Sequence, residues 1–258
     1  NLSLKLGDII GNAQTYIWSF NVSAGGAQTL GNCSTIAANG SYILNQSISS
    51  AATCMYIQAS NVSLDCKGYT ITYGTAGGNS AKGINVSSTG TLSGTLVKGC
   101  IITKNISSGS DSYGILLSNV ISSNITNNII YTNGSTKSYG IYVTSSSSNN
   151  IISNNTVFTK GQSANVGINV GATGSNTIIS NKVHTNSFGG GYSNNWGIQL
   201  ATSSSNIVKF NEITTNGTGK NYGIRISAGS GNNLTSNIVK ANGTDGLNNG
   251  VLLLAGTK

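Results

Sequence analysis

A four-residue pattern recurs along this chain and restricts the folds that it can adopt more than any other feature. A glycine precedes two apolar residues that flank a variable one, in GINV 83–86, GILL 114–117, GIYV 140–143, GINV 167–170, GIQL 197–200, GIRI 223–226 and GVLL 250–253. The starting glycines lie 31, 26, 27, 30, 26 and 27 residues apart, which indicates a repeat architecture. In each copy the two apolar side chains share one face of a β-strand, and we expect the glycine to permit a turn before it.

A second motif places one asparagine in each repeat, half a period away from the glycine. Aligned on the strand residues beside them, these asparagines are Asn128, Asn155, Asn181, Asn211 and Asn237. One asparagine per repeat is what a stacked amide ladder needs, because each side-chain amide can donate to one neighbouring copy and accept from the other. Two short strands per repeat, no helical periodicity and an asparagine corner together predict an all-β chain that forms a parallel β-helix.

The composition excludes several classes of function. Charged residues make up 7% of the chain, where about 25% is typical, and the net charge of +8 reflects scarce acids. The 13 Lys and Arg residues are scattered singly, so the sequence offers no basic groove for nucleic acid. No apolar run approaches the length of about 20 residues that a membrane span needs.

We expect one elongated domain over residues 32–258, preceded by a segment over residues 1–31 that does not match the repeat. This segment is either a cap on the first coil or an extension that docks on a neighbouring molecule. The chain does not begin with methionine, so either a leader has been removed or it is part of something longer. At the other end, a core strand carrying Val251 and Leu253 is followed by no evident cap.

Four cysteines, Cys33, Cys54, Cys66 and Cys100, lie in the first 100 residues. Their spacing supports no zinc site, and His184 is the only histidine of the chain. An even number in an exported chain favours two disulfides, for which three connectivities exist. We favour Cys33 with Cys54 and Cys66 with Cys100, because each pair fits on neighbouring coils.

The segments SYIL 41–44, TCMYI 53–57 and NVSLDCKGYTI 61–71 resemble the opening of right-handed parallel β-helix proteins of prokaryotic, especially archaeal, cell surfaces. Asn39 stands where these proteins usually have proline. The resemblance covers residues 33–258 and includes the later repeats, which look like coils of the pectate-lyase-like superfamily. It implies a single-stranded, right-handed parallel β-helix of about eight coils. It does not imply one function, because the superfamily holds lyases, hydrolases, adhesins and structural proteins.

The acidic residues predict no catalytic site. Enzymes of the superfamily that cleave polysaccharides carry several carboxylates on one outward strand face. Here the five acids fall in different coils, and the outward residues of the glycine-led strands include no carboxylate. We expect Asp65 to bond local backbone in a turn, and His184 and Glu212 to be solvated. The chain is therefore predicted to have no enzymatic activity, metal site or cofactor.

One position before the repeat glycine is aromatic in four copies, at Tyr113, Tyr139, Trp196 and Tyr222. Rings at one address of a solenoid stack on one another, which favours a structural role. The alternative is a strip of rings that stacks against sugar.

The glycosylation sequon Asn-x-Ser/Thr recurs 14 times. Many copies arise by chance in a chain this rich in Asn, Ser and Thr, but those in turn-like settings can accommodate a glycan. The candidates are Asn133, Asn216 and Asn242, followed by Asn105, Asn39 and Asn21.

These patterns favour an extracellular or cell-surface structural glycoprotein whose partners are copies of itself. The N-terminal segment, with Ile17, Trp18 and Phe20, would pair with the open edge at Val251 and Leu253 of the next subunit, building a filament or layer. The first alternative is an adhesin or glycan-binding β-helix that uses the aromatic strip. The second is a degenerate polysaccharide lyase or hydrolase.

Overall fold

The computed structural model describes residues 26–188, 194–244 and 247–254, and these residues form strands β1 to β26 and no helix. Sheet A contains, in spatial order, β1 (Gln28–Leu30), β3 (Gly40–Leu44), β6 (Val62–Asp65), β9 (Leu96–Lys98), β12 (Asn124–Thr126), β15 (Ile151–Ser153), β18 (Thr177–Ile179), β21 (Ile207–Lys209) and β24 (Asn233–Thr235). Sheet B contains β2 (Thr35–Ile36), β5 (Met55–Ile57), β8 (Lys82–Ser93), β11 (Tyr113–Ile121), β14 (Tyr139–Thr144), β17 (Asn165–Gly171), β20 (Asn194–Ala201), β23 (Lys220–Ile226) and β26 (Asn248–Leu253). Sheet C contains β4 (Ile48–Ser49), β7 (Thr70–Thr72), β10 (Ile101–Thr103), β13 (Ile129–Thr136), β16 (Thr156–Ser163), β19 (Lys182–Ser187), β22 (Glu212–Gly217) and β25 (Ile238–Gly243).

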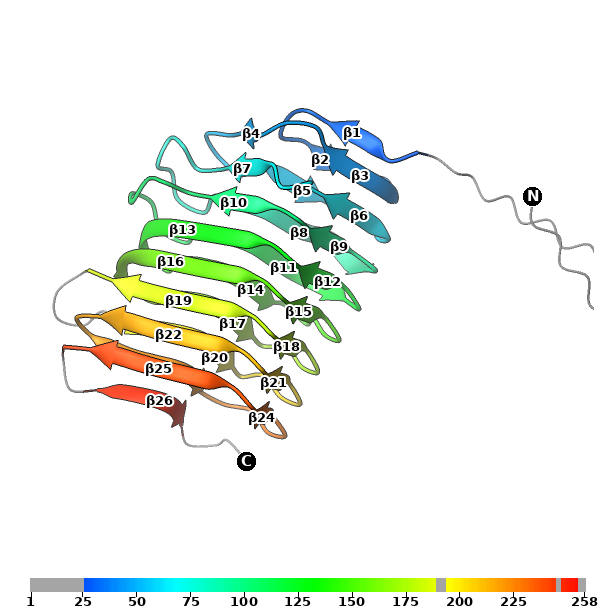
Figure 1. The fold of residues 1–258 in the computed structure, drawn as a ribbon. Coiled ribbons are helices and arrows are strands. Elements are labelled where there is room, and N and C mark those ends of the chain that lie inside the picture. Colours follow the sequence, from blue (N-terminus) through cyan, green and yellow to red (C-terminus); the bar gives the residue numbers. More distant parts are fainter. Residues whose placement is uncertain (1–25, 189–193, 245–246, 255–258) are drawn as a thin grey trace, which may run out of the picture.

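From β3 onward the chain visits sheets A, C and B in turn, so the eight strands of sheet C correspond to eight coils. Successive strands within each sheet pair in parallel. Figure 1 shows the coils stacked from the blue N-terminal end to the red C-terminal end, wound with a right-handed sense. The predicted right-handed parallel β-helix is confirmed.

The core is a set of stacked aliphatic side chains that run along the axis. Ile115, Ile141, Ile168 and Ile198 occupy the same position on neighbouring strands of sheet B, and all four are fully buried. Burying each such side chain contributes about 1.5–3 kcal/mol. The repeated apolar pair of the sequence thus becomes a continuous inner face.

The glycine that begins each repeat does not make the expected turn. Gly140 and Gly167 lie inside strands β14 and β17. A Cβ atom on Gly140 would clash with Cγ1 of Val157 in sheet C and would lie 2.6 Å from the carbonyl oxygen of Gly167. The prediction of a turn is wrong, because this glycine is needed where sheets B and C approach each other closely.

The predicted asparagine ladder is confirmed at the corner between sheets A and C. Oδ1 of Asn155 accepts hydrogen bonds from the backbone nitrogen and from Nδ2 of Asn128, both at 3.0 Å. Nδ2 of Asn155 in turn donates to Oδ1 of Asn181 at 3.0 Å. Two more ladders, which the sequence analysis missed, run through Asn150, Asn176, Asn206 and Asn232 and through Asn165, Asn195, Asn221 and Asn248.

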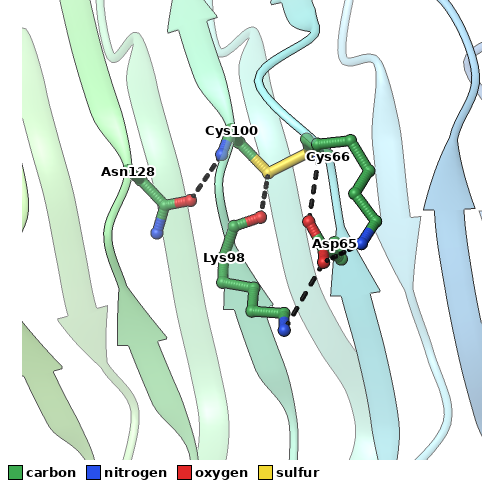
Figure 2. A network of polar contacts seen from close by, with 6 residues as sticks. Asp65, Cys66, Lys98, Cys100 and Asn128 are labelled. Atoms are coloured by element: carbon green, nitrogen blue, oxygen red, sulfur yellow. Dashed lines mark hydrogen bonds and ion pairs between the residues drawn. A yellow bond between two sulfur atoms is a disulfide. The ribbon is translucent and has the colours of Figure 1, made fainter.

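The first coils are linked covalently. Disulfides join Cys33 to Cys54 and Cys66 to Cys100, which is the pairing that the sequence favoured. Cys100 occupies the ladder position of its coil, and its backbone nitrogen donates to Oδ1 of Asn128 at 3.0 Å. Figure 2 shows Asn128, the first asparagine of the ladder, bonded to Cys100 of the disulfide.

The first strand, β1, ends one residue before the domain boundary that was expected at residue 31. Residues 28–30, placed in the N-terminal segment, form β1 and pair with β3 in sheet A. Ile17, Trp18, Phe20 and Asn21 lie outside the described residues. Within the described part of the chain, no helix has the length and hydropathy that crossing a membrane requires.

Candidate functional site

A row of three stacked rings lies on the outer face of sheet C. Tyr131, Phe158 and His184 occupy one register position on β13, β16 and β19. The ring centroids of Tyr131 and Phe158 are 4.9 Å apart with an interplanar angle of 4°, and those of Phe158 and His184 are 5.1 Å apart at 9°. Tyr131 remains 43% exposed, so the row presents an accessible aromatic surface.

A row of amide and amine side chains runs beside the rings, two residues further along each strand. Its members in successive coils are Asn133, Lys160, Asn186, Asn216 and Asn242. The ring row and this amide row, as far as Asn216, line a groove of about 770 Å³. We call it the sheet C groove.

The groove carries one exposed positive charge, the ammonium of Lys160. Among the described residues its lining also includes Lys104 and His184, and no Asp or Glu. Burial lowers the pKa of His184, the charge of Lys182 lowers it further, and Glu212 opposes both effects. His184 therefore presents a neutral ring at pH 7, since even the unperturbed pKa of histidine is about 6.5. Partly exposed rings beside amides and one ammonium suit a ligand with apolar faces and many hydroxyl groups.

The aromatic strip expected from the sequence lies on sheet B and packs largely on itself. Tyr113 and Tyr139 stack at 5.2 Å, and Tyr142 meets both rings edge-on at 5.2 Å. Burial raises the pKa of Tyr139 to about 12. Further along, the guanidinium of Arg225 lies 4.7 Å from the ring centre of Trp196.

Tyr222 follows Trp196 in register and is buried. The four predicted rings thus share one row, interrupted by Val166. Their contacts match the structural alternative better than an open sugar-stacking strip.

The acidic side chains within the described residues do not converge. Asp111 pairs with Lys137 at 3.5 Å and Glu212 pairs with Lys182 at 3.7 Å, each on the surface. Asp8 and Asp245 lie outside the described residues. The outward row of sheet B is free of carboxylates, in register as expected: Asn85, Leu116, Tyr142, Asn169, Gln199, Arg225 and Leu252.

Asp65 has the local role expected of it and also joins neighbouring coils. Its Oδ1 accepts a hydrogen bond from the backbone nitrogen of Lys67 at 2.9 Å. Its Oδ2 lies 3.2 Å from Nζ of Lys67 and 3.4 Å from Nζ of Lys98. Figure 2 shows Asp65 beside Lys98. Burial alone would raise the pKa of Asp65, but the hydrogen bonds and the two ammonium groups together hold it below the usual value.

Soft metal ligands are scarce in this chain. It has one histidine and one methionine, and Met55 is fully buried in the core. All four cysteines are bonded to one another. Among the described residues, no three His, Cys, Asp or Glu side chains are grouped so that they could hold a metal ion.

Among the described residues, the candidate sequon asparagines lie on the surface, and Asn105, Asn133 and Asn216 line the groove. Asn133, Asn216 and Asn242 lie in strands β13, β22 and β25, so the expected turns are absent there. The glycine that follows this position of the strand is needed because neighbouring side chains pack closely against it. A Cβ atom on Gly161, in register with Gly134, would clash with Asn165. Asn105 and Asn39 are exposed beside β10 and β3.

The ring row was not predicted from the sequence, although a signal for it was present. Tyr131, Phe158 and His184 each lie three residues after a ladder asparagine, and the amide row lies five residues after it. A row of unlike residue types is harder to detect than a repeated asparagine. His184, considered alone, was expected to be merely solvated, and the structure instead stacks it on Phe158.

Residues 21–250 match the sequence profile of one family, described as the periplasmic copper-binding protein NosD. The chain belongs to the NosD family. No curated protein sequence matches the chain. The two disulfides and the periplasmic description of the family agree on an oxidising compartment outside the cytoplasm.

Several solved structures are similar in fold. A double mutant of the periplasmic alginate epimerase AlgG is 16% identical with a TM-score of 0.48, and the match covers 85% of this chain and 59% of that one. A DFA-IIIase from Arthrobacter chlorophenolicus A6 is 11% identical with a TM-score of 0.32, over 84% and 80% of the two chains. The mannuronan C-5 epimerase AlgE4 A-module from Azotobacter vinelandii is 10% identical with a TM-score of 0.26, over 90% and 88%. This NosD family member thus spans less than two thirds of the AlgG chain.

Proposed function

We propose that this NosD family member is a non-catalytic carbohydrate-binding protein of the cell exterior, and that it binds a saccharide in the sheet C groove. The observation that carries the proposal is the stack of Tyr131, which is exposed, with Phe158 and His184, which are half-buried, beside a row of amides. Flat rings pack against the apolar faces of sugar rings, and amides both donate to and accept from hydroxyl groups. The rings of sheet B contact one another and Arg225 and therefore offer less of this surface.

The lining of the groove supports binding without turnover. General acid–base cleavage of a glycosidic bond uses two carboxyl groups, one on each side of the bond. The residues that line the groove include no carboxylate, and the imidazole of His184 stacks on Phe158.

The donor set of this chain does not fit a copper centre, although the family is described as copper-binding. Copper in proteins is held by imidazole, thiolate and thioether groups. Here the thiols are consumed in disulfides, the thioether of Met55 is enclosed by the core, and His184 is a single imidazole. We therefore assign no role to copper.

The test is a glycan array followed by calorimetric titration of the strongest ligand. The Phe158→Ala variant removes the middle ring of the stack, and we expect it to raise the Kd at least about tenfold. Phe210→Ala is the matched control, because Phe210 is an exposed phenylalanine outside the groove lining. Equal affinities for Phe158→Ala and the wild-type protein, or no glycan bound at all, would refute the proposal.

A second candidate function is head-to-tail self-assembly, favoured by the last coil. Val251 and Leu253 are 48% and 60% exposed, whereas Ile224 and Ile226, their register partners in β23, are buried. A further coil, from a continuation of this chain or from a second copy, would cover these apolar side chains, and in this candidate function the second copy supplies it. Leu253→Asp should then abolish the assemblies that electron microscopy of the wild-type protein reveals. Monodisperse wild-type monomers at high concentration would exclude this function.

N-linked glycosylation stays a prediction. Two of the predicted sites lie in the groove, where a glycan would affect saccharide binding. Asn133 and Asn216 line the groove, so a glycan attached there would occupy the space of an external saccharide. Intact mass spectrometry of the native protein would identify the occupied sequons.

A further inference from the structure

Lys104 is a lysine at a core position. It follows β10, and the alternation that points Ile102 inward points Lys104 inward as well. Only 1% of its surface is exposed. Its backbone nitrogen donates to the carbonyl oxygen of Tyr131, which places Lys104 in register with Thr132 of the next coil. The next coils continue this row with threonine as far as Thr215, and the last coil has Ala241 there.

The ammonium of Lys104 is surrounded by carbonyl oxygens. Nζ donates to the backbone oxygens of Ile106 at 3.1 Å, Ser108 at 2.5 Å and Asn133 at 3.0 Å. Three acceptors match the three protons of an ammonium group. A buried charge is costly unless its hydrogen bonds are made, so this set of oxygens is what allows the lysine to lie inside the coil.

These three oxygens come from two separate parts of the chain. Ile106 and Ser108 belong to the connection between β10 and β11, while Asn133 lies in β13 of the following coil. A second contact runs alongside, from Nδ2 of Asn133 to the carbonyl oxygen of Asn105 at 3.4 Å. Asn105 and Asn133 both line the sheet C groove. The lysine thus ties the connection to the strand at one end of the groove.

We infer that Lys104 is a positioning residue whose ammonium acts as a tethered cation, fixing residues 105–110 against β13 and thereby setting one end of the sheet C groove. The part of this inference that concerns the groove rests on the proposed saccharide binding. The part that concerns the connection does not, and it is tested separately.

The first arm measures hydrogen exchange in Lys104→Ala at two amides that join the connection to β13: that of Ser135, which donates to the carbonyl oxygen of Gly109, and that of Asp111, which donates to the carbonyl oxygen of Thr136. Propylammonium restores the atoms that this substitution deletes, and n-propanol fills the same space without the charge. We expect exchange to become at least about tenfold faster in the variant, because charge-assisted hydrogen bonds are lost. Propylammonium should reverse the change and n-propanol should not. Lys220→Ala, which removes an exposed lysine, is the matched control and should behave as wild type.

Two results in this arm would overturn the inference: unchanged exchange in Lys104→Ala, or equal rescue by propylammonium and n-propanol. Exchange of the sheet A amides, followed in parallel, shows that the variant remains folded. The Lys104→Met variant preserves most of the side-chain volume and repeats the test without a large cavity.

The second arm measures saccharide affinity in Lys104→Met. We expect the Kd to rise about threefold to tenfold, since one end of the groove is no longer fixed while the rings remain. An unchanged Kd together with faster loop exchange would overturn the link to the groove. Absence of saccharide binding by the wild-type protein would refute the proposed function and leave the first arm to decide on the tethered cation.

Discussion

The first coils and the later coils are held together by different means. Between β6 and β9 the corner is closed by the Cys66–Cys100 disulfide and by the charges around Asp65. From β12 onward the same corner is closed by amides that repeat in each coil. A covalent bond acts mainly by restricting the unfolded chain, whereas the ladder satisfies buried polar groups in the folded one.

The coils that are linked by disulfides are also not the coils that carry the ring row and the amide row. The ring row and the amide row of the groove lie on β13, β16, β19 and β22, where the register is regular from coil to coil. The disulfide-linked coils precede them. The covalent links therefore stabilise the irregular beginning of the β-helix, which supplies one end of the groove through Thr70, Ile101 and Thr103, and the regular part supplies the rings and amides.

The largest effect should come from removing the Cys66–Cys100 disulfide. For the closed loop of 34 residues, the chain-entropy estimate is a loss of about 4 kcal/mol. In the Cys66→Ala, Cys100→Ala double variant, the opening free energy of amides in β6 and β9 should fall by this amount in hydrogen exchange. If amides in β19 and β22 lose as much, the two regions are not independent and the comparison fails.

The next effect should come from Asn181→Ala in the middle of the ladder. The substitution removes the acceptor of two donors of Asn155 and the donor to the carbonyl oxygen of Ile152. Leaving such buried groups unpaired should cost about 3 kcal/mol, measured as denaturant-induced unfolding of the later coils. Asn237→Ala, at the partly exposed end of the ladder, is the matched control and should cost about 1 kcal/mol. Equal losses would mean that position in the ladder is unimportant.

Acid should open the first coils before the later ones. Because the pKa of Asp65 is lower in the folded state than in the unfolded chain, its contribution is present above about pH 4 and is lost as the pH falls through the folded pKa. We expect a loss on the order of 1 kcal/mol, visible as faster exchange in β6 and β9. In Asp65→Asn this step should be missing. A wild-type acid response spread evenly over all coils would contradict the assignment.

The smallest effect should come from Lys182→Met. Lys182 and Glu212 form an ion pair at 3.7 Å, with 51% and 48% of their side chains exposed. Such a pair contributes at most about 0.5 kcal/mol to stability, so the unfolding midpoint should be nearly unchanged. A loss near that of Asn181→Ala would show that surface charge, and not the ladder, holds the later coils.

The sequence predicted those features that repeat with identical residues. The stacked Ile and Val side chains and the ladder through Asn155 could be predicted because one type of residue recurs at the same position of each repeat. The ring row was not, because Tyr131, Phe158 and His184 differ in type and the row gives way to Thr214. Lys104 was missed because lysine is almost never fully buried, and only the geometry of three carbonyl oxygens reveals its role.

The fixed distance of three residues from the ladder asparagine to the ring row has one more consequence. Each coil adds one side chain to the row, and neighbouring coils are about 4.8 Å apart. The length of ligand that the groove can contact is therefore set by how many consecutive coils carry a ring at that offset. Inserting a copy of the coil that contains Phe158 should lengthen the footprint by one such step, and deleting it should shorten the footprint equally, without altering the chemistry of contact.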